Sequence, residues 1–150
     1  MATSMETKIF TLQEAERLLP RMNDSFARIF YLNERIKTIS KDMQELMDIW
    51  DEQILESDNP DNKFYFEKLK NREDTIHELQ KSINEIQQTG CIIKDLNEGL
   101  VDFYCRRNGD LIFLCWKHGE EKIKYWHPLQ GGFTGRRPVE EIIQVSEKQV

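Results

Sequence analysis

Hydrophobic residues between positions 12 and 56 recur with the seven-residue spacing of a long amphipathic helix. They form two series that alternate in steps of three and four residues: Leu18, Ser25, Leu32, Ile39 and Leu46, then Met22, Ile29, Ile36, Met43 and Trp50. Such a repeat is typical of a coiled-coil-like seam between helices. Four more apolar side chains lie beside the seam and predict contact with more than one partner helix: Phe26, Phe30, Met47 and Ile54.

The ends of this helix are marked by local signals. Thr11 and Glu14 have the spacing of a capping box, so we expect the helix to begin at Leu12. Pro20 lies inside the pattern and should kink or briefly break the helix, because its ring removes one backbone hydrogen bond. The pattern fades near Glu56.

A second helix follows the turn at residues 57–61, in which Asn59 is the expected N-cap and Pro60 the first helical residue. Arg72 interrupts its apolar series, and Thr89-Gly90 is the expected end. The series consists of Tyr65, Leu69, Ile76, Leu79, Ile83 and Ile86. Residues 1–90 are therefore predicted to form a long antiparallel helical hairpin.

From Cys91 the hydrophobic period changes to two, which is typical of strands. We expect four strands, at residues 91–95, 100–105, 111–116 and 122–127. Asn108-Gly109 between two of them is a strong hairpin signal, because both residue types tolerate positive φ. The predicted fold class is α+β: the helical hairpin, then a small four-stranded antiparallel meander and a Gly-rich loop in residues 91–150, all in one continuous domain.

Charge narrows the classes of partner. The formal net charge is −6, and residues 1–90 carry 12 Lys and Arg against 18 Asp and Glu, whereas residues 91–150 carry nine of each. No basic face of the kind that binds a phosphate backbone is present, so we expect no nucleic-acid partner. No apolar stretch approaches the roughly 18–20 residues of a membrane span, so we expect no membrane partner either.

The three cysteines are an odd number and lack CxxC spacing. The N-terminus shows no signal-peptide pattern, so we expect a reducing cytoplasmic compartment with the cysteines as buried thiols. We expect none of the residues to bind a metal ion. One alternative stays open, in which Cys105 and Cys115, ten residues apart in neighbouring strands, meet at a metal.

Several motifs of the meander resemble the bacterial and archaeal family known as domain of unknown function 2203. They are Lys94-Asp95, Gly99-Leu-Val-Asp-Phe103, Leu114-Cys-Trp116, Gly119-Glu120, Tyr125-Trp-His127, Gly132-Phe133 and Gly135-Arg136. The opening segments Phe10-Thr-Leu-Gln-Glu-Ala15 and Leu18-Leu-Pro20 are similar too, although Tyr104 stands where many relatives carry proline. The resemblance covers nearly the whole chain. It implies this architecture and this choice of residues, and no activity.

Asp102 is an acid in mid-strand, on the opposite side from Val101 and Phe103. It is a candidate metal ligand, a general base, or the partner that orients His127. The structural alternative pairs its carboxylate with Arg136 or Arg137, because a buried charge needs a partner.

His127 lies between Trp126 and Pro128 at a strand end, where it is suited to proton transfer or metal ligation. The alternative is a hydrogen bond to a backbone carbonyl. Trp126 is expected either to stack over a ligand or to close the sheet onto the helices.

The loop from Gly131 to Arg137 is the candidate anion site. Its glycines, including Gly132, let backbone amides approach an anion, Arg136 supplies a planar fork, and Phe133 shields the ligand from water. It is not a P-loop, because it lacks the GxxxxGK[ST] pattern.

From these residues we expect a small cytoplasmic binding protein rather than an enzyme, homodimeric through its helices. It would present one face to an anionic small molecule or a protein partner: Asp102, Trp126, His127, Gly132, Phe133 and Arg136. The alternative is a small metal-assisted hydrolase that uses Asp102 and His127. No cofactor is indicated by the sequence.

Overall fold

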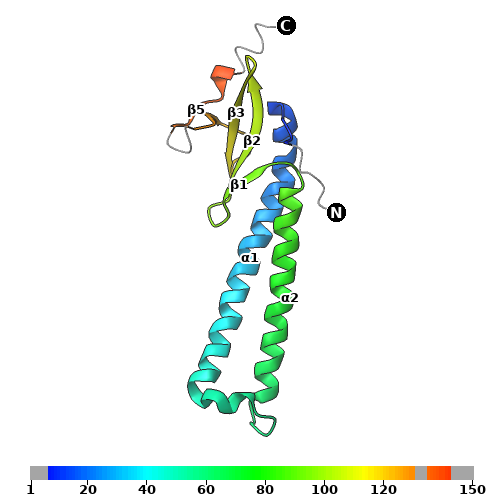
Figure 1. Ribbon diagram of the computed structural model, residues 1–150, viewed down its shortest axis with the longest axis vertical. Coiled ribbons are helices and arrows are strands. Elements are labelled where there is room, and N and C mark those ends of the chain that lie inside the picture. Colours follow the sequence, from blue (N-terminus) through cyan, green and yellow to red (C-terminus); the bar gives the residue numbers. More distant parts are fainter. Residues whose placement is uncertain (1–6, 131–134, 143–150) are drawn as a thin grey trace. The chain divides into compact units, whose positions relative to one another are not determined.

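The computed structural model describes residues 7–130 and 135–142. Its elements are α1 (Leu12–Trp50), the 3-10 helix η1 (Asp51–Leu55), α2 (Asn62–Gln87), β1 (Ile92–Asp95), β2 (Leu100–Arg107), β3 (Asp110–Lys117), β4 (Tyr125–Pro128) and β5 (Arg137–Pro138) (Figure 1). In the described residues, five strands form one antiparallel sheet in the order β1-β2-β3-β4-β5. The predicted α+β fold is confirmed, with five strands instead of four.

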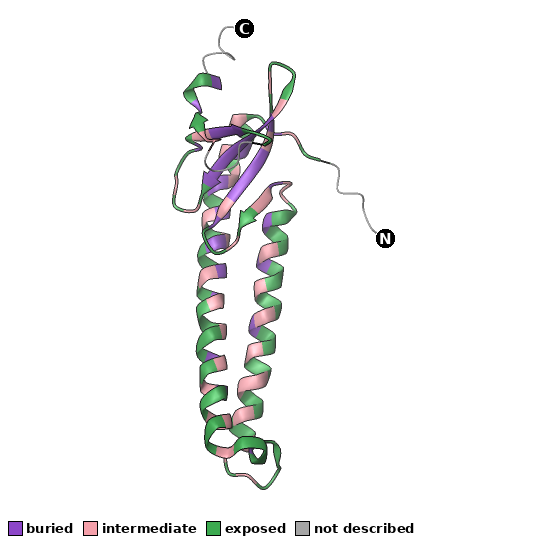
Figure 2. Cartoon of the chain, turned by 60° about the vertical axis from the view of Figure 1, so that its left-hand side comes forward, coloured by how far each residue is buried: buried purple, intermediate pink, exposed green. Residues whose placement is uncertain are grey.

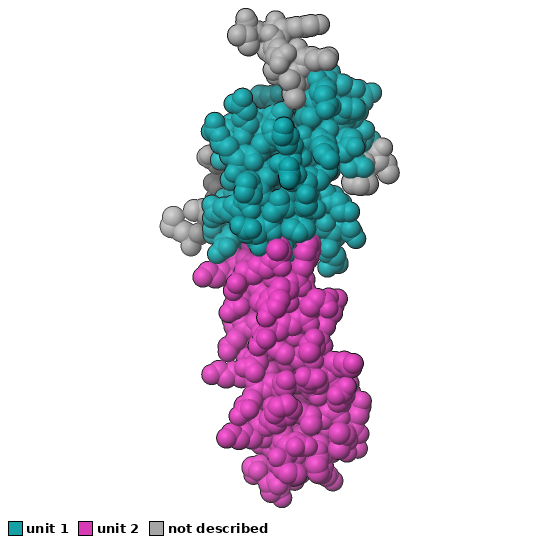
Figure 3. Space-filling model, turned by 180° about the vertical axis from the view of Figure 1, so that it is seen from behind, with its two compact units in different colours: residues 1–26, 85–150 teal, residues 27–84 magenta. Residues whose placement is uncertain are grey.

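The chain divides into two compact units, coloured separately in Figure 3. One contains residues 1–26 and 85–150, and so combines the sheet with the first turns of α1. The other contains residues 27–84, which are the remaining part of α1, η1 and most of α2.

The capping box at the start of α1 is confirmed. The Glu14 amide donates to Thr11 Oγ1, and the Thr11 amide donates to Glu14 Oε1, both at 3.1 Å. The expected break at Pro20 is absent, because α1 runs through it without interruption. Leu19 and Met22 on either side are each 1% exposed, so tertiary packing holds the helix where local propensity disfavours it.

The core of the first unit lies between α1 and one face of the sheet. Phe103 of β2 packs edge-on against Phe10, with ring centroids 5.1 Å apart, and Trp116 of β3 lies 6.0 Å from Phe26. Figure 2 shows the buried residues concentrated on these strands. Full burial of side chains of this size contributes about 1.5–3 kcal/mol each. We call this side of the sheet the helix face and the opposite side the outer face.

The fourth strand begins later than expected. We predicted residues 122–127, whereas β4 spans Tyr125–Pro128, because the Ile123 amide donates to Glu16 Oε2 of α1 instead of to β3. The fifth strand, β5, lies in the segment that we interpreted as irregular loop. It pairs with β4 through two residues, Tyr125↔Pro138 and Trp126↔Arg137. So short a strand, with proline in it, carries no alternating pattern in the sequence.

The second unit is an antiparallel helical hairpin. Three polar contacts link its helices: Arg28 with Glu78, Lys68 with Asp42, and Arg72 with Ser40. Four positions of the predicted apolar repeat are buried, namely Ile29, Leu32, Ile39 and Met43. No helix of the described ranges is long and apolar enough to cross a lipid bilayer.

The hairpin connection differs from the prediction. α2 begins at Asn62, two residues after the expected first helical residue, Pro60. The Asn59 side chain instead accepts a hydrogen bond from the Asp61 amide at 2.8 Å, and Asp61 accepts one from Trp50 Nε1 at 2.8 Å. The turn is therefore two residues longer than its local signals indicated.

Candidate functional site

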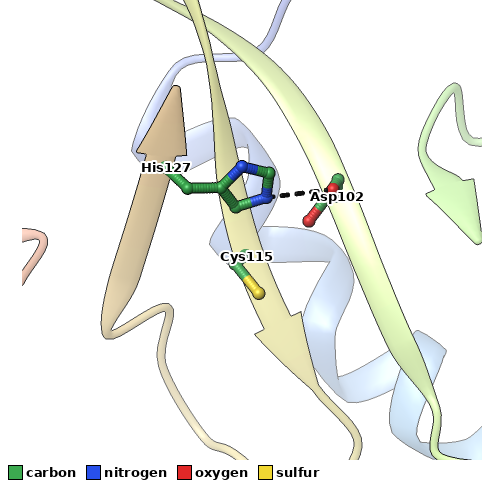
Figure 4. A group of neighbouring side chains, drawn as sticks. All are labelled: Asp102, Cys115 and His127. Carbon is green, nitrogen blue, oxygen red and sulfur yellow. Dashed lines mark hydrogen bonds and ion pairs between the residues drawn. The ribbon is translucent and has the colours of Figure 1, made fainter. Parts of the chain in front are cut away.

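Asp102 and His127 meet on the outer face of the sheet. Asp102 Oδ2 lies 3.1 Å from His127 Nε2, and the two residues are 2% and 3% exposed (Figure 4). The strands that carry them, β2 and β4, are separated by β3. The contact is direct. Two strands on either side of a third are about 10 Å apart, and an aspartate and a histidine facing each other together span that gap.

Cys115 of β3 completes this group. It is the direct cross-strand partner of Asp102, and it lies one strand from His127. The carboxylate oxygen, the thiol sulfur and the imidazole nitrogen of these residues all lie within 4.8 Å of one another. We call Asp102, Cys115 and His127 the three-strand cluster. Figure 4 shows the three side chains on the same side of the sheet, with α1 behind the strands.

The hydrogen bonds define how the pair is protonated. His127 Nδ1 lies 2.8 Å from the Pro128 carbonyl oxygen, which only accepts, so Nδ1 carries a hydrogen. The second nitrogen, Nε2, then faces Asp102 with one proton shared between them. Burial raises the pKa of Asp102, and the charge of His127 opposes that rise. The hydrogen bond to His127 is therefore what satisfies this buried carboxyl group.

Cys115 is not set up as a nucleophile. Burial, followed by the Asp102 carboxylate, raises the pKa of this thiol to about 12. A cysteine hydrolase needs a histidine base within reach of sulfur, whereas His127 has both nitrogens committed to Asp102 and Pro128. A Cys-His nucleophilic mechanism therefore does not fit this cluster.

Aromatic and cationic side chains surround the three-strand cluster. Lys94 Nζ lies 3.9 Å from Asp102 Oδ2, and it also lies 5.1 Å from the centroid of the Phe113 ring. The Phe113 ring contacts the His127 ring at 5.2 Å. The Lys94 side chain is 48% exposed, so it reaches from solvent toward the buried carboxylate of Asp102.

Trp126 lies on the opposite side of the sheet, because neighbouring residues of a strand face opposite ways. It pairs with Leu114 on the helix face and is 2% exposed. The structure therefore separates it from Asp102 and His127, which we had placed with it on one binding face. Trp126 instead lines a groove of about 910 Å³.

Two arginines line the same groove: Arg107 of β2, which we did not single out, and Arg137 of β5, which we considered only as an ionic partner of Asp102 and as the end of the Gly-rich loop. The guanidinium carbon of Arg107 lies 4.7 Å from the centre of the Trp126 ring, and that of Arg137 lies 5.7 Å from it. Trp126 Nε1 and Arg107 Nε are buried donors that have no hydrogen-bond acceptor within the described ranges. We call this the Trp126 groove.

Three predicted site residues remain, and one of them, Arg136, lies on the outer face, on the same side of the sheet as Asp102 and His127. The Arg136 guanidinium carbon lies 4.5 Å from the ring centre of Tyr125, which faces the side opposite Trp126. Gly132 and Phe133 lie outside the described residues. Asp102 is not paired with Arg136 or Arg137 in the described contacts, since its ionic partners are His127 and Lys94.

The sequence contains a local signal that places Cys115 beside Asp102. A two-residue Asn-Gly hairpin pairs the residues on either side of it, here Arg107 with Asp110, and counting back along both strands places Asp102 opposite Cys115. We had instead considered Cys105 and Cys115 together. They do not meet, because Cys105 lies on the helix face of β2 opposite Ile112.

Comparison with known proteins identifies the family of the chain but assigns no activity to it. Residues 8–139 match the family model described as "Uncharacterized conserved protein (DUF2203)". Neither the curated proteins nor the solved structures include a significant match to the chain. The match spans both the helices and the sheet, and the chain therefore belongs to the DUF2203 family of uncharacterized conserved proteins.

Proposed function

We propose that this protein binds a small anionic ligand, carrying a carboxylate or phosphate group, in the Trp126 groove. The observation that carries the proposal is the pair of buried N–H donors, Trp126 Nε1 and Arg107 Nε, in a groove with two guanidinium groups. A buried donor without an acceptor costs about 1–3 kcal/mol, so a ligand that accepts from it recovers that energy.

The charges of the groove support an anion. Arg107 and Arg137 contribute two positive charges, and Asp110 is the one acidic residue among the described residues that line the groove. Guanidinium groups bind carboxylate and phosphate through two parallel hydrogen bonds, which makes them suited to this chemistry. Cation–π contacts with the Trp126 indole restrict the orientations of both guanidinium groups before a ligand binds. The two arginines therefore lose less conformational entropy when they bind an anion.

Size and lining also fit a small molecule. A volume of about 910 Å³ falls within the usual range of ligand pockets. Leu111, Ile112 and Leu129 contribute apolar surface, and Gln130 adds an amide. We expect the ligand to carry an apolar portion beside its anionic group.

The test uses the indole N–H signals of the three tryptophans in a ¹⁵N-correlated NMR spectrum. Trp116 Nε1 already donates to the Glu120 carbonyl at 2.9 Å, and Trp50 Nε1 donates to Asp61 at 2.8 Å. Titration with inorganic phosphate, and separately with citrate, should shift the Trp126 signal alone. Equal shifts at all three indoles, or no shift at Trp126, would contradict the proposal.

Matched arginine variants separate binding from general electrostatics. Arg107→Ala and Arg137→Ala should each weaken binding at least about tenfold, because each removes a charged donor. Arg106→Ala is the control, since it removes the same charge from the next residue of β2, on the opposite side of the sheet. If Arg106→Ala weakens binding as much as Arg107→Ala, the anion is attracted by net charge and not by the groove.

We further propose that the protein acts in the cytoplasm. All three cysteines are free and buried, which suits a reducing compartment. The competing function, a metal-assisted hydrolase that uses Asp102 and His127, depends on whether these residues bind a metal. The direct hydrogen bond between them keeps that function as the second candidate.

A further inference from the structure

We propose that Asp102, Cys115 and His127 bind one divalent transition-metal ion of the zinc class. The site is independent of the Trp126 groove, because it lies on the other side of the sheet and uses different residues. Its three donors, a carboxylate oxygen, a thiol sulfur and an imidazole nitrogen, are the three side-chain donor types that zinc takes in proteins.

The positions of the donor atoms are close to those of a coordination sphere. Metal–sulfur and metal–nitrogen or –oxygen distances of about 2.3 and 2.0 Å place the ligand atoms of a tetrahedral site roughly 3.3–3.8 Å apart. Here the atoms lie within 4.8 Å of one another, and Asp102 Oδ2 and His127 Nε2 are 3.1 Å apart. Side-chain movements of about 1 Å or less would complete the arrangement.

His127 is already in the tautomer that a metal requires. Ligating histidines usually donate their other ring N–H to a carbonyl or carboxylate, which fixes the ring and increases the basicity of the ligating nitrogen. His127 Nδ1 donates to the Pro128 carbonyl at 2.8 Å. The lone pair of Nε2 is then the one that faces Asp102 and Cys115.

Charge balance supports a metal at this place. A carboxylate and a thiolate together offset the two positive charges of the ion, and a neutral imidazole adds none, so the buried centre would be neutral. Binding displaces two protons, one from the Cys115 thiol and one from the Asp102–His127 pair, and both leave to solvent.

Three protein ligands leave one coordination position open. No fourth Asp, Glu, His or Cys joins this group within the described ranges. Three ligands plus a water or substrate is the arrangement of catalytic zinc sites. Lys94 lies 3.9 Å from Asp102 Oδ2, and its positive charge favours an anion, such as hydroxide, as the fourth ligand.

The experiment uses cobalt(II), which adopts the tetrahedral coordination of zinc and absorbs in the near ultraviolet when a thiolate binds it. The double variant Cys91→Ala/Cys105→Ala leaves Cys115 as the single thiol of the chain. We expect it to bind one equivalent of Co²⁺ with the thiolate charge-transfer band, and zinc to displace the cobalt. Absence of that band in both this variant and the wild type would overturn the proposal, as would a band that only the wild type shows.

Ligand variants provide the second arm. Cys115→Ser keeps the size of the side chain and should lose the charge-transfer band, whereas Asp102→Asn and His127→Gln should weaken Co²⁺ affinity more than about tenfold. Circular dichroism of each metal-free variant reports whether it folds. A folded Cys115→Ser protein that retains the band would refute the assignment.

The groove variant Arg107→Ala separates this site from the proposed anion site. It should bind Co²⁺ as the wild type does, because Arg107 belongs to the helix face. Zinc should raise the melting temperature of the wild type and of Arg107→Ala, but not that of folded Cys115→Ser. A zinc-induced rise of equal size in Cys115→Ser would show that the metal binds elsewhere.

Discussion

At the scale of single residues, a buried N–H group that has an acceptor within the protein is structural, whereas one without an acceptor is available to bind a ligand. The indole groups of Trp50 and Trp116 donate within the protein, to Asp61 and to the Glu120 carbonyl. The Trp126 indole is buried and has no acceptor among the described residues. The same residue type is therefore structural at two positions and a candidate binding group at the third.

The capping box at Glu14 predicts an acid-sensitive start of α1. Hydrogen bonds from the Thr11 amide and hydroxyl lower the pKa of Glu14 below its usual 4.5. A lowered pKa in the folded state means that the stabilisation is present above pH 4.5 and is lost as the pH falls through the folded value. Glu14→Gln should thus lower the melting temperature at pH 7, and the difference from the wild type should shrink on acidification. Parallel melting curves of both proteins between pH 7 and pH 3 test this, and a difference that does not change with pH would contradict it.

At the scale of elements, the buried side of α2 is offset from the side that the sequence indicated. Thr75 and Ser82 are 5% and 4% exposed, whereas the isoleucines that follow them, Ile76 and Ile83, are only half-buried. The Thr75 hydroxyl donates to the Asn71 carbonyl at 2.6 Å, so its polar group is satisfied within the helix. Small hydroxyl residues can therefore occupy a seam that periodicity assigns to larger apolar ones.

Two glycines in turns predict losses of different size. Gly109 has φ +85° and an added Cβ would meet nothing within 4 Å, so Gly109→Ala should cost about 1–2 kcal/mol through backbone strain alone. Gly90 has φ +100°, and its Cβ would also lie 2.9 Å from Lys8 Cβ. We expect Gly90→Ala to be the more destabilising change.

Urea unfolding curves of the two variants, monitored by near-ultraviolet circular dichroism, measure the difference. Gly119→Ala is a matched control for Gly109→Ala, because its φ is +99° and its added Cβ likewise meets nothing within 4 Å. A smaller loss in Gly90→Ala than in Gly109→Ala would show that the segment around Lys8 yields to the added methyl group.

At the scale of the whole molecule, the question is whether the helical unit associates with a second copy. We expected Phe26 and Ile54 to contact a further partner helix, but both are fully buried within one chain. Other apolar side chains are exposed in residues 27–84: Tyr31, Ile49, Leu55, Phe64 and Phe66. The last four belong to the hairpin connection and the helix ends beside it, where exposed apolar surface of this kind marks an interface.

We therefore predict a homodimer whose two copies contact each other at the hairpin connection. Ile49 is 70% exposed and Phe64 49% exposed, and covering them would remove apolar surface from water. The double variant Ile49→Ser/Phe64→Ser should be monomeric, and Arg28→Ser, on an exposed part of α1, should not change the association. Light scattering at tens of micromolar measures both. A monomeric wild type at that concentration would end the prediction.

The sequence by itself determined the two long helices, the first three strands and the direction of their side chains. Capping at Thr11, the Asn108-Gly109 turn with φ of +52° and +85°, and the positive φ at Gly90 are all local features, and each was predicted from the residues that form it. Strand alternation likewise placed the Asp102 side chain on the opposite side of the sheet from Val101 and Phe103. These features need only interactions between residues close in sequence, which is why the pattern alone suffices.

Only the tertiary structure decided which side chains of β4 meet those of the other strands. The register of β4 against β3 depends on the segment of residues 118–124, whose path is held by contacts to α1, from Gly119 to Asn23 and from Ile123 to Glu16. That register brings His127 to Asp102 and Cys115, and it turns Trp126 to the other side of the sheet, toward Arg107. A shift of one residue would exchange the two faces. Long-range hydrogen bonds select one register from several that the hydrophobic pattern permits equally, so the two candidate sites exist only in the folded chain.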